Sequence, residues 1–175
     1  MGYESIVFVA EPGQLATLFP GWKPALAAPI TRTAVNSFTN EPMTMVIETV
    51  DYDEDDEPST TRDWWDRWRE AAPPSISREI SPRNMEKLAR AMAVEGPAYL
   101  RALSEPPDSE TTVFELVAAF VEALATASPE RHPALGRALR DDLDEANATA
   151  LLARLIELAR KAQETHARLY VVEDR

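Results

Sequence analysis

The two ends of the chain carry short apolar runs with the composition of buried β-strands. Near the start, Ser5–Ala10 reads Ser-Ile-Val-Phe-Val-Ala, and near the end Leu169–Val172 reads Leu-Tyr-Val-Val. Continuous apolar runs of this length are typical of strands that are covered on both faces. From Arg62 onward the intervening sequence shows mainly helical periodicity. We therefore expect the two terminal strands to lie together in one sheet that packs against helices.

A β-hairpin is predicted in the first third of the chain. Thr31–Phe38 and Met43–Val50 have strand propensity, and the Thr-Asn-Glu-Pro connection between them supplies turn residues. Pro42 cannot donate a ladder hydrogen bond, so the second strand should begin at or after Met43. We expect this hairpin to join the terminal strands in a small mixed or antiparallel sheet.

The remaining segments predict a helical layer of about five helices. Ser81-Pro82 is a typical helix start, because a side-chain acceptor at the N-cap is followed by proline at the first helical position. The five longer helices are expected at 63–72, 82–93, the very apolar 110–126, 132–142 and 144–165. In addition, one or two helical turns are expected at 14–19, and a shorter helix carries Tyr99, Leu100 and Leu103. A length of 175 residues is enough for one core. The sequence thus predicts a single α+β domain over residues 1–175, with the sheet on one side and the helices on the other.

The composition narrows the classes of partner. The formal net charge of -12 argues against non-specific binding to nucleic acid or anionic lipid and favours a basic protein partner. Without cysteine, the chain has no disulfides and no thiolate zinc site. No apolar stretch is long enough for a membrane span and no signal peptide is recognisable, so we expect a cytoplasmic protein. Fifteen of the eighteen basic residues are arginine, which is typical of a GC-rich bacterial genome.

A dense acidic run precedes the helical part of the chain. Seven carboxylates and no base lie between residues 48 and 57: Glu48, Asp51, Asp53, Glu54, Asp55, Asp56 and Glu57. Self-repulsion and Pro58 predict a loop over residues 51–59. Alternating aspartates resemble the start of a calcium loop, but the EF-hand pattern fails, since Asp56 replaces its glycine and Arg62 its closing glutamate. A solvated loop, a docking surface for a basic protein and a cation site all remain open.

Three tryptophans follow the acidic run, at Trp64, Trp65 and Trp68. On a helix Trp64 and Trp68 share one face, and Trp65 is turned about 100° away from Trp64. The pattern fits a helix that packs into the core through two indoles, with Trp65 as the ring most exposed to solvent. It also fits an interface, where tryptophan is enriched at the residues that contribute most to binding.

No motif in the sequence indicates catalysis. There is no phosphate-binding glycine-rich loop and no nucleophile elbow, and His132 and His166 lack the spacing of a metal pair. Scattered carboxylates such as Glu110, Glu115 and Glu122 are too common to indicate an acid–base pair. We therefore expect a protein that is not an enzyme and that binds neither a cofactor nor a metal.

The order of the elements resembles that of the uncharacterised YfbM-like small bacterial proteins. The shared features are the Met-Gly start before an early strand, the strand–Ser-Pro–helix unit over Ser77–Ala93, and the helix that runs into a hydrophobic strand over Leu151–Val172. The resemblance is one of architecture and extends over about half of the chain. It implies a similar fold for that part, but no activity and no site residues.

These observations together predict a non-catalytic protein-binding domain. Its most specific form is an immunity or inhibitor protein that neutralises a basic toxin or nuclease, with partner contacts at Asp53, Asp55, Asp56, Trp64 and Trp65. Three alternatives remain. The first is a small-molecule-sensing domain with a pocket between sheet and helices lined by Trp22, Phe38 or Phe120. The second is an enzyme or metal-binding domain that uses carboxylates. The third is a homo-oligomeric subunit that associates through Trp65 or the Leu18–Trp22 loop.

Overall fold

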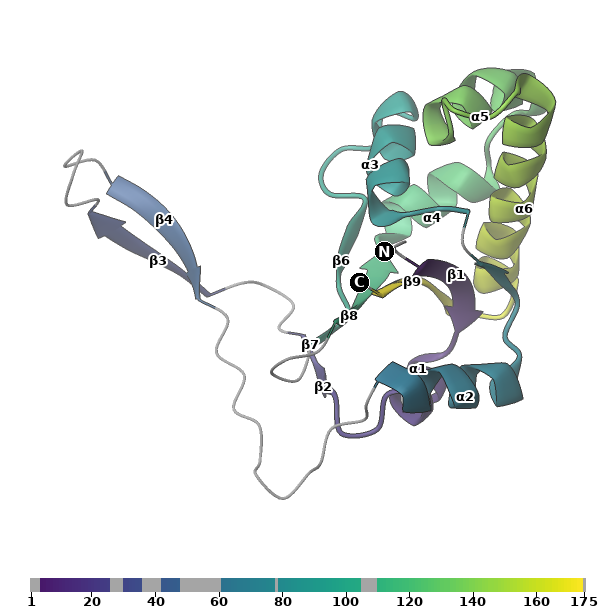
Figure 1. Cartoon of the computed structure of the whole chain (residues 1–175). Helices are drawn as coiled ribbons and strands as arrows, with labels where there is room; N and C mark the ends of the chain where they lie inside the picture. Colours follow the sequence, from purple (N-terminus) through teal and green to yellow (C-terminus); the bar gives the residue numbers. More distant parts are fainter. Residues whose placement is uncertain are drawn as a thin grey trace.

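A five-stranded antiparallel sheet forms the centre of the molecule (Figure 1). The computed structural model describes residues 4–25, 30–35, 42–47, 61–77, 79–104 and 110–174. In spatial order the strands are β5 (Ser75–Ser77), β1 (Glu4–Ala10), β9 (Arg168–Asp174), β8 (Thr111–Leu116) and β6 (Tyr99–Arg101). β1 and β9 pair along their whole length, from Glu4 opposite Asp174 to Ala10 opposite Arg168. The prediction that the two terminal strands lie together is confirmed.

Helices cover both faces of this sheet. Their bounds are α1 Pro12–Leu18, α2 Thr61–Ala71, α3 Pro82–Ala91, α4 Ala118–Ala125, α5 His132–Leu139 and α6 Glu145–Glu164, and a 3-10 turn, Pro129–Arg131, precedes α5. α3 to α6 pack on one face, while α1 and α2 lie on the other (Figure 1). The α+β class is confirmed, and the expected layer of helices on one side is joined by a second, smaller layer opposite.

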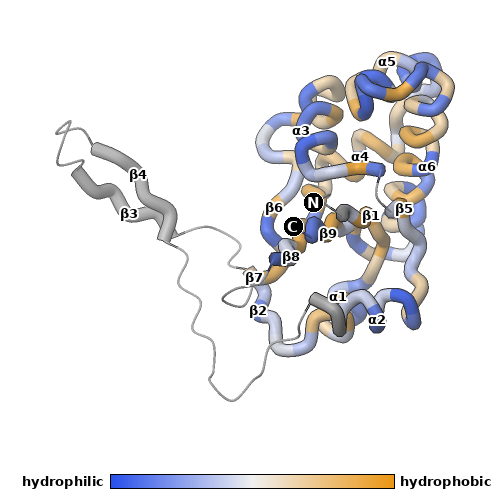
Figure 2. The backbone as a smooth tube through the Cα atoms, viewed as in Figure 1, coloured by the Kyte–Doolittle hydropathy of each residue, from blue (hydrophilic) through white to orange (hydrophobic). Residues whose placement is uncertain are grey.

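The two faces of the central strands supply two separate hydrophobic cores. Because side chains alternate along a strand, Val7 and Val9 enter the large core beneath α3–α6. Ile6 and Phe8 enter the small core beneath α1 and α2. Figure 2 shows the apolar character of α4 and of the inner side of α6, both of which contribute to the large core. An apolar strand without polar alternation is therefore explained by cover on both sides.

The Ser81-Pro82 start of α3 is confirmed. The Ser81 side chain accepts a hydrogen bond from the Asn84 backbone N–H, the Asn84 Oδ1 accepts one from the Ser81 backbone N–H, and Pro82 opens the helix. The predicted helices 14–19, 63–72, 132–142 and 144–165 also form, with slightly shifted ends.

Two segments predicted to be helical contain strands: one wholly and one in its first half. The apolar segment 110–126 is divided into β8 and α4, with Val117 as the N-cap between them. A short apolar run cannot be assigned from periodicity alone, and the pairing of β8 with β9 decides its first half. The predicted short helix around residues 99–103 is β6 followed by β7 (Leu103–Ser104), which pairs with β2 (Lys23–Pro24).

The predicted hairpin forms from β3 (Ile30–Val35) and β4 (Pro42–Ile47), with Ile30 opposite Ile47 and Val35 opposite Pro42. Within the described part of the chain these strands pair only with each other, in a two-stranded sheet of their own. The expectation that the hairpin extends the central sheet is therefore wrong for the described residues. The acidic loop predicted at 51–59 lies outside the residues that the structure describes.

The helices of the large core approach one another closely at Gly136 in α5. A Cβ atom built there would lie 2.9 Å from the carbonyl carbon of Ala148 and 3.0 Å from the backbone nitrogen of Thr149, both on α6. Such a distance is shorter than an ordinary carbon contact, so only glycine permits this packing.

Among the described helices, none combines the length and the apolar composition that a bilayer span requires.

Candidate functional site

A continuous row of aromatic rings joins the segment directly after α1 to α2. Phe19 lies 4.9 Å from Trp22 and 5.4 Å from Trp64, measured between ring centroids. Trp64 stacks on Trp65 at 4.6 Å, and Trp65 meets Trp68 edge to face at 5.6 Å. Stacked and edge-to-face aromatic pairs each contribute about 0.5–1.5 kcal/mol beyond the burial of their area. The row therefore stabilises α2 against α1 and the sheet.

The structure separates the predicted partner-binding residues from one another. Trp64 is only 1% exposed and belongs to the small core, so the prediction that it contacts a partner is corrected. The cause is the wide apolar surface of α1 and β1, which takes up the face of α2 that carries this indole. Trp65 is half-buried and retains a partly exposed surface. Asp53, Asp55 and Asp56 lie outside the described residues.

Two indole donors in α2 are buried without an acceptor from the described residues. They are the Nε1 atoms of Trp64 and Trp68, which lie one helical turn apart. A buried donor without an acceptor costs on the order of 1–3 kcal/mol. The position of α2 is therefore set by ring packing, and these two N–H groups weaken the gain from that packing.

A pocket of about 500 Å³ opens between α1 and α2. Its floor and walls are largely apolar and come from the end of β1, from both helices and from the Pro-Pro pair after α2. The lining residues are Val9, Ala10, Gln14, Thr17, Leu18, Arg67, Glu70, Ala71, Ala72, Pro73 and Pro74. A concave, mainly apolar site with a few polar groups is the usual form of a binding site.

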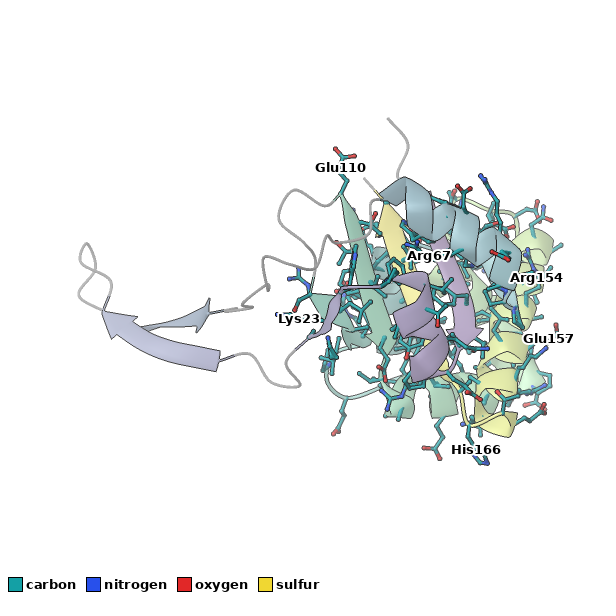
Figure 3. The ribbon with its side chains drawn as sticks, turned by 90° about the horizontal axis from the view of Figure 1, so that it is seen from below. Lys23, Arg67, Glu110, Arg154, Glu157 and His166 are labelled. Atoms are coloured by element: carbon teal, nitrogen blue, oxygen red, sulfur yellow. The ribbon has the colours of Figure 1, made fainter. Side chains whose placement is uncertain are left out.

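Arg67 forms one wall of the α1–α2 pocket and connects the two helices. Its Nε donates a hydrogen bond of 2.9 Å to the backbone carbonyl of Leu18, the last residue of α1. The carbonyl end of a helix is its negative end, where a guanidinium is favoured. Figure 3 shows Arg67 between α1 and α2. This cation is thereby engaged within the fold.

Glu70 lies three residues further along α2, at the same pocket, and its side chain is exposed. Within the described part of the chain it has neither an ion pair nor a hydrogen bond. Some other carboxylates of the described surface are paired: Glu79 lies 3.0 Å from the Arg154 guanidinium, and Glu115 lies 3.0 Å from that of Arg168. Glu70 therefore supplies a negative charge at the pocket that forms no ion pair with a described residue.

A second, smaller hollow of about 330 Å³ lies beside α3 and β6. Burial and a 2.8 Å hydrogen bond from its hydroxyl to Glu86 raise the pKa of Tyr99 to about 12. Burial likewise raises the pKa of Tyr170 to about 12. Both phenols hold their protons at neutral pH and act as neutral groups.

The alternative sites predicted from the sequence can also be placed. Trp22 belongs to the small core and Phe120 to the large one, on opposite faces of the sheet, so these two residues do not line one common pocket. The expected pocket lined by Trp22, Phe38 or Phe120 stays a prediction. Phe38 lies outside the described residues. Across the described ranges, no three His, Asp or Glu side chains are grouped closely enough to hold a metal ion.

Comparison with known proteins adds no relative. No protein-family model, curated protein or solved structure matches the chain. The resemblance to the YfbM-like proteins stays a prediction.

No pattern in the sequence predicts the α1–α2 pocket. Its one local signal is Pro73-Pro74, which ends α2 and places two rigid apolar rings at the pocket wall. The remaining walls come from β1 and α1, more than fifty residues earlier. Their approach to α2 depends on tertiary packing that local pattern does not report.

Proposed function

We propose that this protein is a non-catalytic protein-binding domain of the bacterial cytoplasm whose partner is basic and docks against the α1–α2 side. The observation that carries the proposal is the pocket between α1 and α2, with the carboxylate of Glu70 beside it, which has no ion pair among the described residues. A pocket that accepts an anchor side chain is a common centre of a protein interface.

Charge supports a basic partner. The chain carries a net charge of -12, and the run of seven carboxylates ends at Glu57, four residues before the start of α2. Negative charge on a protein increases the rate of its association with a cation-rich partner.

The position of Trp65 also supports docking of the partner on the α1–α2 side. Trp65 and Trp68 are the half-buried members of the aromatic row, and Trp65 stacks on the buried Trp64, which holds it in a fixed orientation. A rigid, partly exposed indole loses little conformational entropy when a partner covers it. An immunity or inhibitor protein that neutralises a basic toxin or nuclease would use such a surface.

The test is capture of a partner from the native host at increasing salt. We expect a basic protein to be retained at low ionic strength and released as salt screens the charges. The triple variant Asp53→Asn, Asp55→Asn, Asp56→Asn should retain less of it. The triple variant Glu95→Gln, Glu157→Gln, Glu164→Gln, with the same change in net charge on exposed positions elsewhere, should retain as much as the wild type. Retention that does not depend on salt would contradict the proposal.

An immunity role is tested by whether co-expression of the chain protects cells from the captured partner.

A second candidate function is the sensing of a small molecule. The pocket volume of about 500 Å³ favours it, because ligand sites in proteins usually measure roughly 300–1,000 Å³. Native mass spectrometry of protein purified from its host would then show a bound molecule of constant mass. Loss of that mass in Ala71→Trp, which fills the pocket entrance, would place the molecule there.

A further inference from the structure

We infer that the α1–α2 pocket receives an arginine or lysine side chain of the partner, with its aliphatic stem on the apolar floor and its cationic head at Glu70. The inference rests on the proposed function and specifies its anchor contact. Three features of the pocket carry it, namely its shape, its lining and its unequal charges.

The lining suits the stem of a long basic side chain. Val9, Leu18, Ala71, Pro73 and Pro74 present carbon atoms along the floor and walls. Arginine and lysine bury their methylene groups on apolar surface while the charged head stays at the polar rim. The volume of about 500 Å³ holds such a side chain together with the water that accompanies its head group.

The arrangement of the charges favours a cation at the Glu70 end of the pocket. Two ionised side chains line the pocket, Arg67 and Glu70. Arg67 is held by the Leu18 carbonyl at 2.9 Å, where the negative end of α1 partly offsets its charge. Glu70 has no ion pair or hydrogen bond to any described residue. An incoming guanidinium or ammonium group would give this carboxylate its ion pair, whereas an incoming carboxylate would be repelled by it.

The experiment uses two small probes of nearly equal shape. N-acetyl-arginine methylamide carries the cation, and N-acetyl-citrulline methylamide replaces it with a neutral urea. Each is titrated into the full-length ¹⁵N-labelled protein while amide chemical shifts are recorded. We expect the arginine probe to bind in the millimolar range and to shift the amide signals of pocket residues on α1 and α2. The citrulline probe should bind more weakly.

Three variants separate the pocket from general surface charge. Glu70→Gln should weaken binding of the arginine probe by about two- to five-fold, which is the range of one exposed ion pair. Ala71→Leu, which fills the exposed mouth of the pocket, should remove the shifts. Glu157→Gln alters an exposed carboxylate on α6 (Figure 3) and should leave the affinity for the probe unchanged.

The outcomes distinguish this inference from the proposed function. Shifts that fall outside the pocket, equal binding of citrulline, or a Glu70→Gln variant that binds like the wild type would overturn the anchor contact. The capture experiment could still identify a basic partner in that case, and the proposed function would stand. If the arginine probe occupies the pocket and the chain retains no basic protein, the anchor site stands and the proposed function fails.

Discussion

Gly136→Ala tests whether the close contact between α5 and α6 sets the packing of the large core. The added methyl group would lie 2.9 Å from the carbonyl carbon of Ala148 and 3.0 Å from its oxygen. Ordinary carbon contacts begin near 3.5 Å, and the atoms it meets are backbone atoms that cannot rotate away. α5 must therefore move outward by several tenths of an ångström.

The expected magnitude is the difference between two effects. Overpacking of a core costs about 1–3 kcal/mol, whereas glycine to alanine inside a helix gains about 1 kcal/mol. The net result is a loss of about 1 kcal/mol in the free energy of unfolding. Gly13→Ala in α1 is the matched control, because a Cβ atom there meets nothing within 4 Å. It should be neutral or gain up to about 1 kcal/mol.

Urea denaturation followed by circular dichroism gives both free energies of unfolding. We expect Gly136→Ala to be less stable than Gly13→Ala by about 1–2 kcal/mol. If the two variants are equally stable, the helices do not approach as closely as the structure places them, and the reasoning from backbone contact fails. Because Gly136 is on the face opposite the pocket, the affinity of the folded variant for the arginine probe should not change.

Three further predictions concern α2, the end of α3 and the surface near α5. Trp64→Ala should lower the free energy of unfolding by about 3–5 kcal/mol. Trp64→Phe should lower it much less, because phenylalanine keeps a ring and removes the N–H that lacks a described acceptor. Thermal denaturation measures both losses, and equal losses would contradict the packing argument. Ala93→Gly should raise the free energy of unfolding by about 0.5–1 kcal/mol, because Ala93 has a φ of 58° after the end of α3, in the left-handed region that glycine adopts without strain. The control Ala150→Gly, inside α6, should lower it by about 1 kcal/mol. A loss of stability at both positions would show that the left-handed conformation of Ala93 is not costly. The Arg140 guanidinium lowers the pKa of Asp142 from 3.8 to about 2, so its stabilising effect is present above pH 3.8 and is lost as the pH falls towards 2. Asp142→Asn should reduce the loss of stability over this pH range, and an unchanged acid-denaturation curve would show that the pair contributes nothing.

Local sequence signals were sufficient where the determining interaction is itself local. Ser81, Pro82 and Asn84 lie within four residues, and their side chains determine where α3 begins. The terminal strands could be predicted because an apolar run without polar alternation requires cover on both faces. Their mutual pairing followed only from the similarity of their composition.

The errors arise where distant segments decide the structure. Thr111–Leu116 and the helix after it form one apolar run, and only the pairing of β8 with β9 makes its first part a strand. The sequence around Trp64 fits a core residue and an interface residue equally well. Its burial depends on the packing of α1 against α2, which the local sequence does not indicate. The pocket was missed for the same reason, since its walls come from three elements that are far apart in the sequence.

The pairing of β1 with β9 also affects the order in which the domain can fold during synthesis. Ile6 lies opposite Val172, so the middle of the sheet connects positions separated by nearly the whole described chain. Contacts of such long sequence separation form slowly because a large loop must be closed first. Until β9 is in place, β1 and β8 each expose an unpaired edge, and unpaired edges are prone to aggregation. Insertion of β9 between them is therefore the step that closes the centre of the sheet and removes both exposed edges.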